Sequence, residues 1–500
     1  MFTASNARRV ALILAGAWAA FNGFVYTADA SKRYRAEAAW FIFSAVLIVA
    51  ALHALARGAR QTSPDYPVPT FRLSAIAFLC LLVLAAALYF PMLSIGLLSD
   101  DFVLLGRAQA GALADPAWDY LRPLPLAIWT VLSGFGGSAV LHFFNIGLHG
   151  ANAYLTGIVA TRFGLSLRSA LVAAIVFLVL PSSVEAVAWA SGVFDVLLVT
   201  LTLTACIALT TISESLPRTI LIVLLTAGAL LTKETAVILP ALLAIAAWCS
   251  PRSTMRRAAV PIACSAGVVV LYLVIRVLAG FASSPPSEHL SGYALKEIVS
   301  RPFGTLALPF HIEFLKSHPW IPFVFAAYWP ALFVWSAVRW PNARKDAGQL
   351  LALAAWIVIS IMPLATMLFI SEDLQGARYL YLGSVAWSII LAGLLRSIRE
   401  PQRMWVLIPV IAVFVIATRA HQSPWTAAAD ERKRVLATYR QSEMRCIPEK
   451  VRGLPDNVKG AYVFRNGFAE AIAASTPSAE STAPCVLNWD GTRFSRGDAR

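Results

Sequence analysis

The sequence predicts an all-α polytopic membrane protein with about 11–13 transmembrane helices and a small α+β module at its C-terminal end. Hydrophobic residues make up 58% of the 500 positions, and charged residues make up only 14%. Apolar runs of spanning length recur from Val10 to Arg419, and the hydrophobicity then falls. A soluble core could not bury so many such runs, because crossing a bilayer takes about 20 consecutive apolar residues.

The apolar runs give eleven predicted spans and two further candidates. The eleven lie at about residues 10–27, 37–56, 73–97, 138–161, 169–189, 194–212, 219–232, 235–249, 259–281, 320–338 and 349–370, and the two candidates lie at 379–395 and 404–419. The short segments on either side of Lys233 and Glu234 form either one broken helix or two spans that meet at a tight turn. We favour two spans, because together they exceed one crossing. No small-residue cleavage site follows the first run, so we expect a retained helix rather than a signal peptide.

The basic residues predict how the chain is oriented. A net charge of +14 would suggest nucleic-acid binding in a soluble protein, but cytoplasmic loops are commonly basic and no basic-aromatic module is visible. We therefore expect no nucleic-acid partner. With a cytoplasmic N-terminus, the inner loops carry 17 Lys and Arg residues and the outer loops carry 10, with the tail and one arginine within a span set aside. This orientation places the acidic pair at Asp100, Lys233, Arg378 and the tail on the outer face.

Hydrophobicity divides the chain into three parts. Residues 1–72 form a predicted transmembrane hairpin, residues 73–419 a transmembrane domain, and residues 420–500 a small extracytoplasmic C-terminal module. The outer loops 98–137 and 282–319 mix charged, aromatic and apolar residues, which is typical of short helices lying in the membrane interface. The C-terminal module contains an amphipathic segment and a β-like run, which suffice for a small α+β fold.

The six cysteines divide between the spans and the tail. Four lie in or beside apolar spans, where cysteine behaves as a small apolar residue. Cys446 and Cys485 lie in the C-terminal module, and on an oxidising outer face a disulfide is favoured over two free thiols. No cluster of His, Cys and Asp has metal-ligand spacing, and the sequence contains no phosphate-binding loop, dinucleotide fingerprint or serine-hydrolase elbow. The sequence therefore predicts no metal site and no nucleotide cofactor.

Two adjacent carboxylates, Asp100 and Asp101, directly follow a long apolar run. Charge at the membrane edge is costly unless water or a ligand meets it, so the pair is expected at the outer interface. One interpretation is that Ser99 and both acids cap the N-terminus of a short helix, where an acceptor oxygen and negative charge are favourable. The other interpretation is catalysis by one of the carboxylates.

Other polar residues near the outer face also have two interpretations each. Glu185, Asp195 and Glu234 either line a substrate pocket or pair with Lys233 and cap the ends of spans. Arg276 lies late in its span and needs an anionic partner, which is either a substrate phosphate or a carboxylate such as Glu234.

His142, Asn145 and His149 share one helical face, at spacings of three and four residues. Their side chains suit hydrogen bonds between helices as well as contact with a substrate. The histidines of the outer loops, including His289 and His311, are interpreted as part of an interfacial cover.

Six short strings between Leu98 and Leu382 are informative as a set. They are Leu98–Phe102 (LSDDF), Arg122-Pro123, Leu141–Asn145 (LHFFN) with His149, Pro181–Trp189 (PSSVEAVAW) with Ser191-Gly192 and Asp195, Thr232–Thr235 (TKET) leading to Pro240, and Ala377–Leu382 (ARYLYL). Together they resemble the membrane part of the transmembrane and tetratricopeptide-repeat O-mannosyltransferases and their bacterial relatives. Leu180 stands where that family usually has histidine, and the tail shows no 34-residue helical repeat.

The resemblance implies a GT-C fold and an inverting sugar transfer from a polyprenyl-phosphate carrier to an acceptor hydroxyl. Asp100 matches the family's catalytic carboxylate, and Asp101 would orient the acceptor or tune its neighbour. The leaving phosphate needs cationic stabilisation, for which the candidates are Lys233, Arg378 and Arg276. The candidate pocket residues are Glu185, Asp195, Glu234, His142 and Asn145.

The function expected from the resemblance is a polyprenyl-phosphate-sugar-dependent glycosyltransferase of the bacterial inner membrane, with its active site on the outer face. The acceptor would be a protein, a lipid or an envelope glycan, and no cofactor is required. Two alternatives are an envelope polysaccharide polymerase or ligase, and a transporter or flippase for lipid-linked saccharides. A transporter should show midplane charges or repeat symmetry, whereas this sequence places a carboxylate pair and cations on one face.

Overall fold

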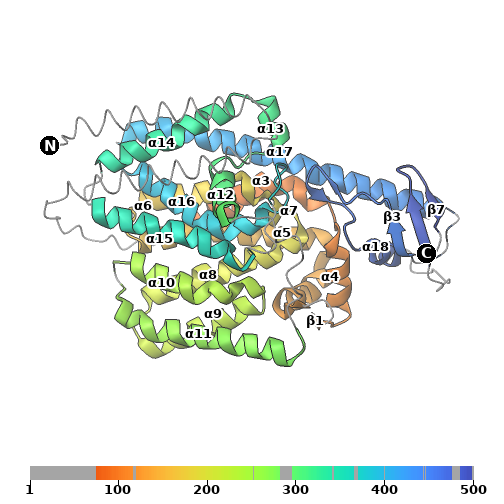
Figure 1. The fold of residues 1–500 in the computed structure, drawn as a ribbon, viewed down its shortest axis with the longest axis horizontal. Helices are drawn as coiled ribbons and strands as arrows, with labels where there is room; N and C mark the ends of the chain where they lie inside the picture. The colour runs from red at the N-terminus through yellow and green to blue at the C-terminus, as the bar shows by residue number, and fades with distance from the viewer. Residues whose placement is uncertain are drawn as a thin grey trace.

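A computed structural model describes most of the chain from Ala75 onward. The described residues are 75–115, 120–251, 253–281, 295–339, 343–364, 370–398, 400–442, 444, 446, 448–475 and 485–497. The predicted hairpin at 1–72, with its two spans, lies outside them, as do residues 282–294 of the second outer loop. Within the described part the chain is mostly helical (Figure 1).

Seven helical segments of the described chain are long and apolar enough to cross a membrane. They are Ala75–Ser94, Pro123–Arg162, Ala190–Thr211, Met255–Leu278, Ala347–Leu364, Ala377–Leu395 and Gln402–Gln441. The pair Leu167–Val179 and Pro181–Ala188 passes the same test but bends by 52° at its break. Shorter apolar helices lie at Ser215–Leu230, Glu234–Cys249 and Ile321–Ser336. Every predicted span from residue 73 onward thus coincides with an apolar helical segment, as expected of a mostly helical membrane protein.

The helical body contains fifteen described helices, joined in places by short 3-10 turns. The helices are α3 (Ala75–Tyr89), α4 (Asp100–Gln109), α5 (Pro123–Arg162), α6 (Leu167–Val179), α7 (Val184–Ala188), α8 (Val193–Thr211), α9 (Ser215–Leu230), α10 (Leu239–Cys249), α11 (Met255–Leu278), α12 (Leu295–Ala307), α13 (Ile312–Ser317), α14 (Ile321–Arg339), α15 (Ala343–Ile361), α16 (Tyr381–Leu395) and α17 (Glu400–Gln441). The 3-10 turns are η2 (Phe90–Ser94), η4 (Pro181–Ser183), η5 (Ala190–Gly192), η6 (Glu234–Ile238), η8 (Met362–Leu364) and η9 (Ala377–Leu380). Strands β1 (Ala114–Asp115) and β2 (Tyr120–Leu121) pair antiparallel in the first outer loop.

Proline and glycine residues lie where two of the long helical segments bend. Pro181 opens η4, where the missing N–H of proline removes no helical hydrogen bond, and the chain bends at the preceding Leu180. Within α5, Gly136 and Gly137 have non-helical backbone angles, and the φ of Gly137 is 66°. The predicted span 138–161 is therefore the second half of a longer, kinked helix.

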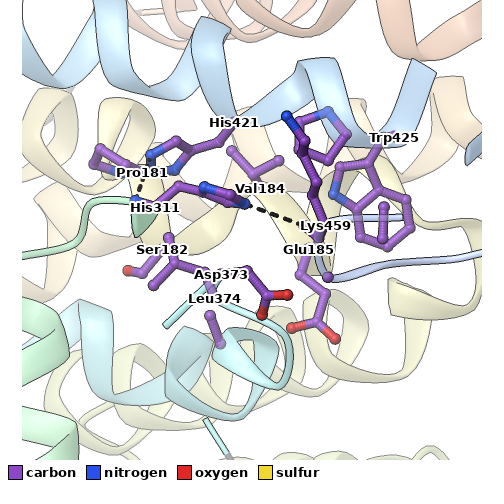
Figure 2. Close-up of a pocket in the computed structure, with 14 residues that line it drawn as sticks. Pro181, Ser182, Val184, Glu185, His311, Asp373, Leu374, His421, Trp425 and Lys459 are labelled. Carbon is purple, nitrogen blue, oxygen red and sulfur yellow. Dashed lines mark hydrogen bonds between the residues drawn. The ribbon is translucent and has the colours of Figure 1, made fainter. Parts of the chain in front are cut away.

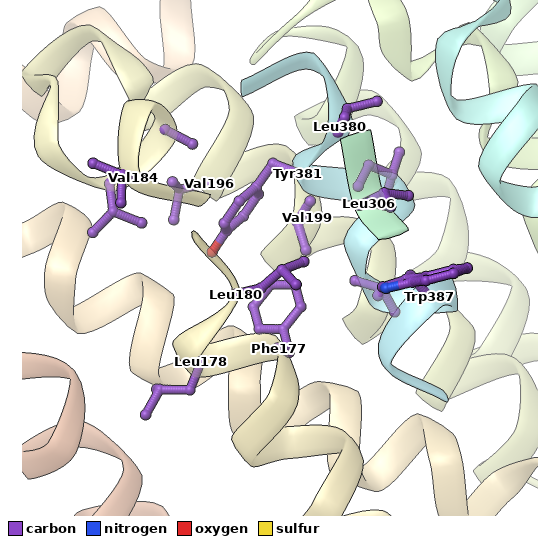
Figure 3. Close-up of a cluster of buried hydrophobic side chains, with 14 of the residues drawn as sticks. Phe177, Leu178, Leu180, Val184, Val196, Val199, Leu306, Leu380, Tyr381 and Trp387 are labelled. Atoms are coloured by element: carbon purple, nitrogen blue, oxygen red, sulfur yellow. The ribbon is translucent and has the colours of Figure 1, made fainter. Parts of the chain in front are cut away.

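The helical body packs around α5, α6, α8 and α16. Phe177 of α6, Val196 of α8 and Tyr381 at the start of α16 lie in one buried apolar cluster (Figure 3). The rings of Phe177 and Tyr381 meet edge to face, with centroids 5.3 Å apart. In a bilayer such packing, rather than the hydrophobic effect, drives helix association. This packing lies beside α7, which contains Glu185, and beside η9, which contains Arg378.

Helix α17 connects the helical body to the C-terminal module (Figure 1). Its 42 residues include both the predicted span 404–419 and the predicted amphipathic segment Trp425–Arg440. The domain boundary predicted at residue 420 therefore lies inside a helix. Because no turn separates the two parts, the orientation of the C-terminal module follows that of α17.

The C-terminal module is a small α+β unit, as its sequence predicts. It contains β3 (Pro448–Arg452), β4 (Asn457–Val458), β5 (Ala461–Tyr462), α18 (Phe468–Ser475), β6 (Cys485–Trp489) and β7 (Phe494–Arg496). Strand β6 lies between β3, which is parallel to it, and β7, which is antiparallel. Cys446 and Cys485 form a disulfide between the segment after α17 and β6. This pairing is the one that the sequence favours.

Polar contacts gather at two opposite ends of the helices. At the start of α9, Arg218 donates to the carbonyl of Arg257 at 3.0 Å. Beyond the other end of α9, Lys233 forms an ion pair, and Arg122 and Arg378 also pair with carboxylates. Arg218 and Arg257 lie in predicted inner loops. Lys233, Arg122 and Arg378 lie in predicted outer loops. These five residues therefore lie at opposite ends of the helices, whereas the membrane orientation itself stays a prediction.

Candidate functional site

The two adjacent carboxylates lie in different surroundings. Asp101 is fully buried in the first turn of α4, and its Oδ2 accepts from the Leu98 backbone N–H at 2.9 Å. Its Oδ1 accepts from the Ser191 backbone N–H at 2.8 Å and from the Ser191 hydroxyl. Burial raises the pKa of Asp101 to about 7, although these hydrogen bonds favour its ionised form. Asp101 therefore ties the start of α4 to η5, which is a structural position rather than a surface for a substrate.

Asp100 is half-buried and faces the C-terminal module. Its Oδ1 accepts from Asn466 Nδ2 at 2.6 Å and from the Ser99 hydroxyl at 3.4 Å. Ser99 occupies the N-cap position of α4, but its side chain makes no capping hydrogen bond and its φ is 51°. The acidic pair does lie at a helix N-terminus, where negative charge is favourable. Of the two acids, Asp100 is the one whose carboxylate can reach a substrate.

Arg378 lies in a cage of aromatic rings at the start of η9. Its Nη1 donates to Glu185 Oε1 at 2.8 Å, and its backbone N–H donates to Glu185 Oε2 at 3.0 Å. The guanidinium carbon lies 4.7 Å from the Trp189 ring centroid, 5.0 Å from that of Tyr379 and 5.6 Å from that of Tyr462. An arginine between ring faces keeps its donors in a fixed plane, which suits a two-point contact with an oxyanion.

Two more ion pairs lie beside this cage. Lys233 Nζ is 2.6 Å from Asp195 Oδ1, and both side chains are nearly buried. Arg122 donates to both oxygens of Glu234, at 2.8 and 2.6 Å. Lys233 also lies 5.4 Å from the centroid of Tyr379, the ring that covers the guanidinium of Arg378.

These pairs bear on the two interpretations of the pocket carboxylates. Glu185, Asp195 and Glu234 each pair with a cation, and Asp195 rather than Glu234 is the partner of Lys233. Arg378 retains more exposure than Lys233, with 17% of its side chain accessible against 6%. Of Lys233 and Arg378, two of the three cations that the sequence proposes for a phosphate, Arg378 is therefore the more accessible.

Arg276 lies at the end of α11, beside two aromatic side chains. Its Nη1 donates to the Tyr272 hydroxyl at 3.3 Å, and its guanidinium carbon is 5.8 Å from the Phe281 ring centroid. Glu234, one of its two expected partners, is bound at both oxygens by Arg122. Tyr272, the partner of Arg276, interacts electrostatically with both members of that ion pair.

Polar side chains on one face of α5 form hydrogen bonds with segments at the ends of neighbouring helices. His142 Nε2 is 3.0 Å from the Gly96 carbonyl oxygen, and Asn145 Nδ2 donates to the Trp189 carbonyl at 2.9 Å. One turn on, His149 Nδ1 is 2.8 Å from the Tyr381 hydroxyl. All three side chains are fully buried. These contacts fit the first interpretation, hydrogen bonding between segments. They hold Gly96, which precedes α4, and Tyr381, which follows η9.

Glu185, Asp373 and Trp425 are among the residues that line a small cavity (Figure 2). Its volume of about 20 Å³ has room for one water molecule. His311 and His421 line it, and the His311 backbone N–H donates to His421 Nε2 at 2.9 Å. His311 Nε2 lies 3.1 Å from the carbonyl oxygen of Lys459, which belongs to the C-terminal module. The second outer loop and the C-terminal module therefore meet at this cavity.

Several contributing residues were not predicted as site residues. Trp189 and Tyr379 occur in the recognised strings, but their role as ring faces for a cation needs three-dimensional contacts. Asn466 and Tyr462 lie more than 300 residues from Asp100 in the chain, and no local pattern links them to it. Arg122 was noted only as part of a string, although it forms a bidentate ion pair.

Among the residues that the structure describes, no group of three or more His, Cys, Asp and Glu could hold a metal ion. Comparison with known proteins adds no assignment, because no family model and no curated protein matches this chain. The interpretation of the site therefore rests on its geometry and on the strings in the sequence.

Proposed function

We propose that the protein is an inverting glycosyltransferase of the GT-C type that uses a polyprenyl-phosphate sugar as its donor. The observation that carries the proposal is the placement of Asp100 and Arg378 on either side of one short segment. Asp100 contacts Asn466, and the ring of Tyr462, four residues earlier, lies 5.6 Å from the Arg378 guanidinium. A candidate base and a candidate phosphate ligand thus both contact residues 462–466 of the C-terminal module.

The chemistry assigns different tasks to the two groups. The acceptor oxygen forms a bond to the anomeric carbon while the bond from that carbon to the carrier phosphate breaks, with inversion. The acceptor proton passes to Asp100, which acts as the general base. The bonding electrons leave with the phosphate, and Arg378 stabilises its added negative charge through two parallel N–H contacts.

The ion pairs give Glu185 and Asp195 a supporting role in this scheme. Each holds a cation in place and balances its charge while no donor is bound. A donor phosphate would compete with Glu185 and with the Tyr379 hydroxyl for the guanidinium of Arg378, whereas the nearly buried Lys233 would act through its position near Tyr379. We therefore assign Arg378 the direct phosphate contact and Lys233 a charge-balancing role.

A transporter or flippase is less well supported than an enzyme. The three ion pairs lie together at one end of the helices, and Asp100 lies at that end too. A transport pathway needs binding groups accessible from both sides, typically near the membrane midplane. A polysaccharide polymerase or ligase would use the same chemistry and would differ only in having a glycan as its acceptor.

The first test replaces the proposed base, Asp100, with asparagine, which has nearly the same shape but cannot accept the acceptor proton. Asp100→Asn should lower sugar transfer at least ~100-fold, because general-base catalysis typically contributes that much, and donor affinity should stay nearly unchanged. Protein in nanodiscs is given polyprenyl phosphate that carries a labelled hexose, with an envelope extract as the acceptor source. Transferred label measures turnover, and a direct binding titration with the same donor measures affinity.

A second variant separates binding from chemistry. Arg378→Lys keeps the charge that pairs with Glu185 but loses the two-point contact, so donor affinity and turnover should both fall. Asp430→Asn is the control for removing an acidic side chain, because Asp430 is exposed on α17. Normal transfer by Asp100→Asn with every donor in a panel of hexoses and pentoses would refute the proposed role of Asp100.

A further inference from the structure

The C-terminal module docks directly on the acidic pair. The Ser99 backbone N–H donates to the Val463 carbonyl at 3.0 Å, and the Asn466 backbone N–H donates to the Ser99 hydroxyl at 3.3 Å. Gly467 follows with a φ of +83°, and a Cβ at this position would collide with the Ser99 carbonyl oxygen. The close approach of the two backbones thus depends on a glycine, and it places the Asn466 amide against Asp100.

The docking segment, residues 462–467, is itself firmly held. The Val463 backbone N–H donates to the Asp456 carbonyl at 2.9 Å, and the Phe464 N–H donates to the Pro455 carbonyl at 3.1 Å. The ring of Tyr462 packs on Trp189, with centroids 4.6 Å apart. Fixed on both sides, the segment can hold a side chain in one position relative to α4.

The Asn466 amide is chemically suited to orient a carboxylate without neutralising it. Its Nδ2 donates at 2.6 Å to Oδ1 of Asp100, and the second hydrogen bond to Asp100 in the described chain, from Ser99, also reaches Oδ1. The contacts from the described residues therefore leave Oδ2 for a substrate hydroxyl. A neutral donor limits carboxylate rotation but adds no positive charge that would weaken a base.

The neighbouring cation is held by another acid. Arg465 precedes Asn466, and its guanidinium makes two contacts with Asp456, at 3.0 and 3.1 Å. Asp456 therefore holds the guanidinium of Arg465 within the C-terminal module, where this cation also interacts electrostatically with Asp100. Without this pair, a long flexible cation would lie one residue from the contact with Asp100.

We propose that Asn466 is a positioning residue for Asp100, so that the C-terminal module completes the active site of the membrane-embedded body. This inference rests on the proposed function, because it gives Asn466 an effect only through the catalytic carboxylate. It makes residues 462–467 one wall of the acceptor side of the site.

A double-mutant cycle tests whether Asn466 acts through Asp100. Asn466→Ala should lower kcat by about 10-fold, the scale of one hydrogen bond to a charged group, with little change in the KM for the hexose-carrying donor. In the Asp100→Asn background the same change should have no further effect, because the group that it positions is no longer a base. A residue that only stabilised the fold would lower activity in both backgrounds.

Asn457→Ala is the matched control. Asn457 is also an exposed asparagine of the C-terminal module, and its Nδ2 donates to Asp456 Oδ2 at 3.0 Å rather than to α4. This variant should retain normal kcat. Thermal unfolding and non-reducing electrophoresis establish that each variant is folded and carries its disulfide.

The outcomes separate the two proposals. If Asp100→Asn lowers transfer but Asn466→Ala leaves kcat unchanged, the positioning role is wrong and the glycosyltransferase proposal stands. If Asn466→Ala lowers kcat equally in both backgrounds, the positioning role is also wrong. If Asp100→Asn leaves transfer unchanged, the proposed function fails first.

Discussion

Asp100 and Asp101 are adjacent in sequence, but the fold gives them different capacities. Asp101 accepts three hydrogen bonds from backbone and hydroxyl groups and has no exposed surface. Asp100 is partly accessible, and both of its hydrogen bonds to described residues are made by one oxygen. At the scale of single residues, one acid is suited to hold a turn and the other to exchange a proton with a substrate.

The buried acid should make stability depend on pH. The pKa of Asp101 is raised to about 7 from an ordinary value of 3.8, so the folded chain binds this proton more tightly than the unfolded chain. Its contribution to stability is therefore greatest below pH 4 and is lost as the pH rises towards 7. The difference between the unfolding midpoints of the wild type and of Asp101→Asn should therefore become less favourable to the wild type as the pH rises from about 4 to about 7. Thermal unfolding in detergent between pH 4 and 8 measures the difference, and two parallel curves would contradict the assignment.

Sequence patterns could identify individual polar residues but not their partners. The strings around Asp100, Lys233 and Arg378 marked three side chains that the fold keeps at one end of the helices. Which carboxylate each cation meets depends on contacts between segments that are far apart in the chain, such as the pair of Arg378 with Glu185. Asn466 gave no signal, because an asparagine near a glycine is common in turns.

At the scale of helices and strands, apolar runs predicted the positions of helices well and their breaks less well. The length of an apolar run indicates a transmembrane span. The bend at Leu180, by contrast, comes from Pro181 together with the packing that follows it. The kink in α5 at Gly136 and Gly137 extends that helix well beyond its predicted span. The fusion of a span with an amphipathic segment in α17 was also missed, because the change in hydrophobicity suggested a boundary.

The disulfide should matter more to the C-terminal module than to the helical body. Cys446 and Cys485 are 39 residues apart, and closing a loop of that size stabilises a fold by roughly 3–4 kcal/mol in the chain-entropy model. Replacing both with serine should speed proteolysis of residues 442–497 while α3 to α16 stay protected. Mass spectrometry of time-resolved digests measures the two rates separately. Cys80→Ser, which removes an exposed free thiol, is the control, and equal protection of the C-terminal module in both variants would contradict the prediction.

At the scale of the whole molecule, the separation of basic residues predicts which end of the helices faces the cytoplasm. In a variant without the four free cysteines, Cys introduced at Ser253 should resist an impermeant thiol reagent in intact cells and react after permeabilisation. Cys introduced at Thr492, in the C-terminal module, should react in intact spheroplasts. Labelling of Ser253→Cys alone in intact cells would reverse the orientation and place the site in the cytoplasm, where a different donor would be expected.

The number of residues in helix α17 determines where Asn466 lies relative to Asp100. Arg419 and Gln422 fasten the helix to the Leu88 carbonyl, at 2.9 and 3.0 Å, and the same helix then runs on to Gln441. Each residue added to an α-helix turns everything beyond it by about 100° and advances it by about 1.5 Å. One insertion between Gln422 and Gln441 would therefore swing Asn466 away from Asp100 without altering a single side chain at the site. The number of residues in α17 beyond Gln422 therefore sets the rotation of the C-terminal module about the axis of this helix.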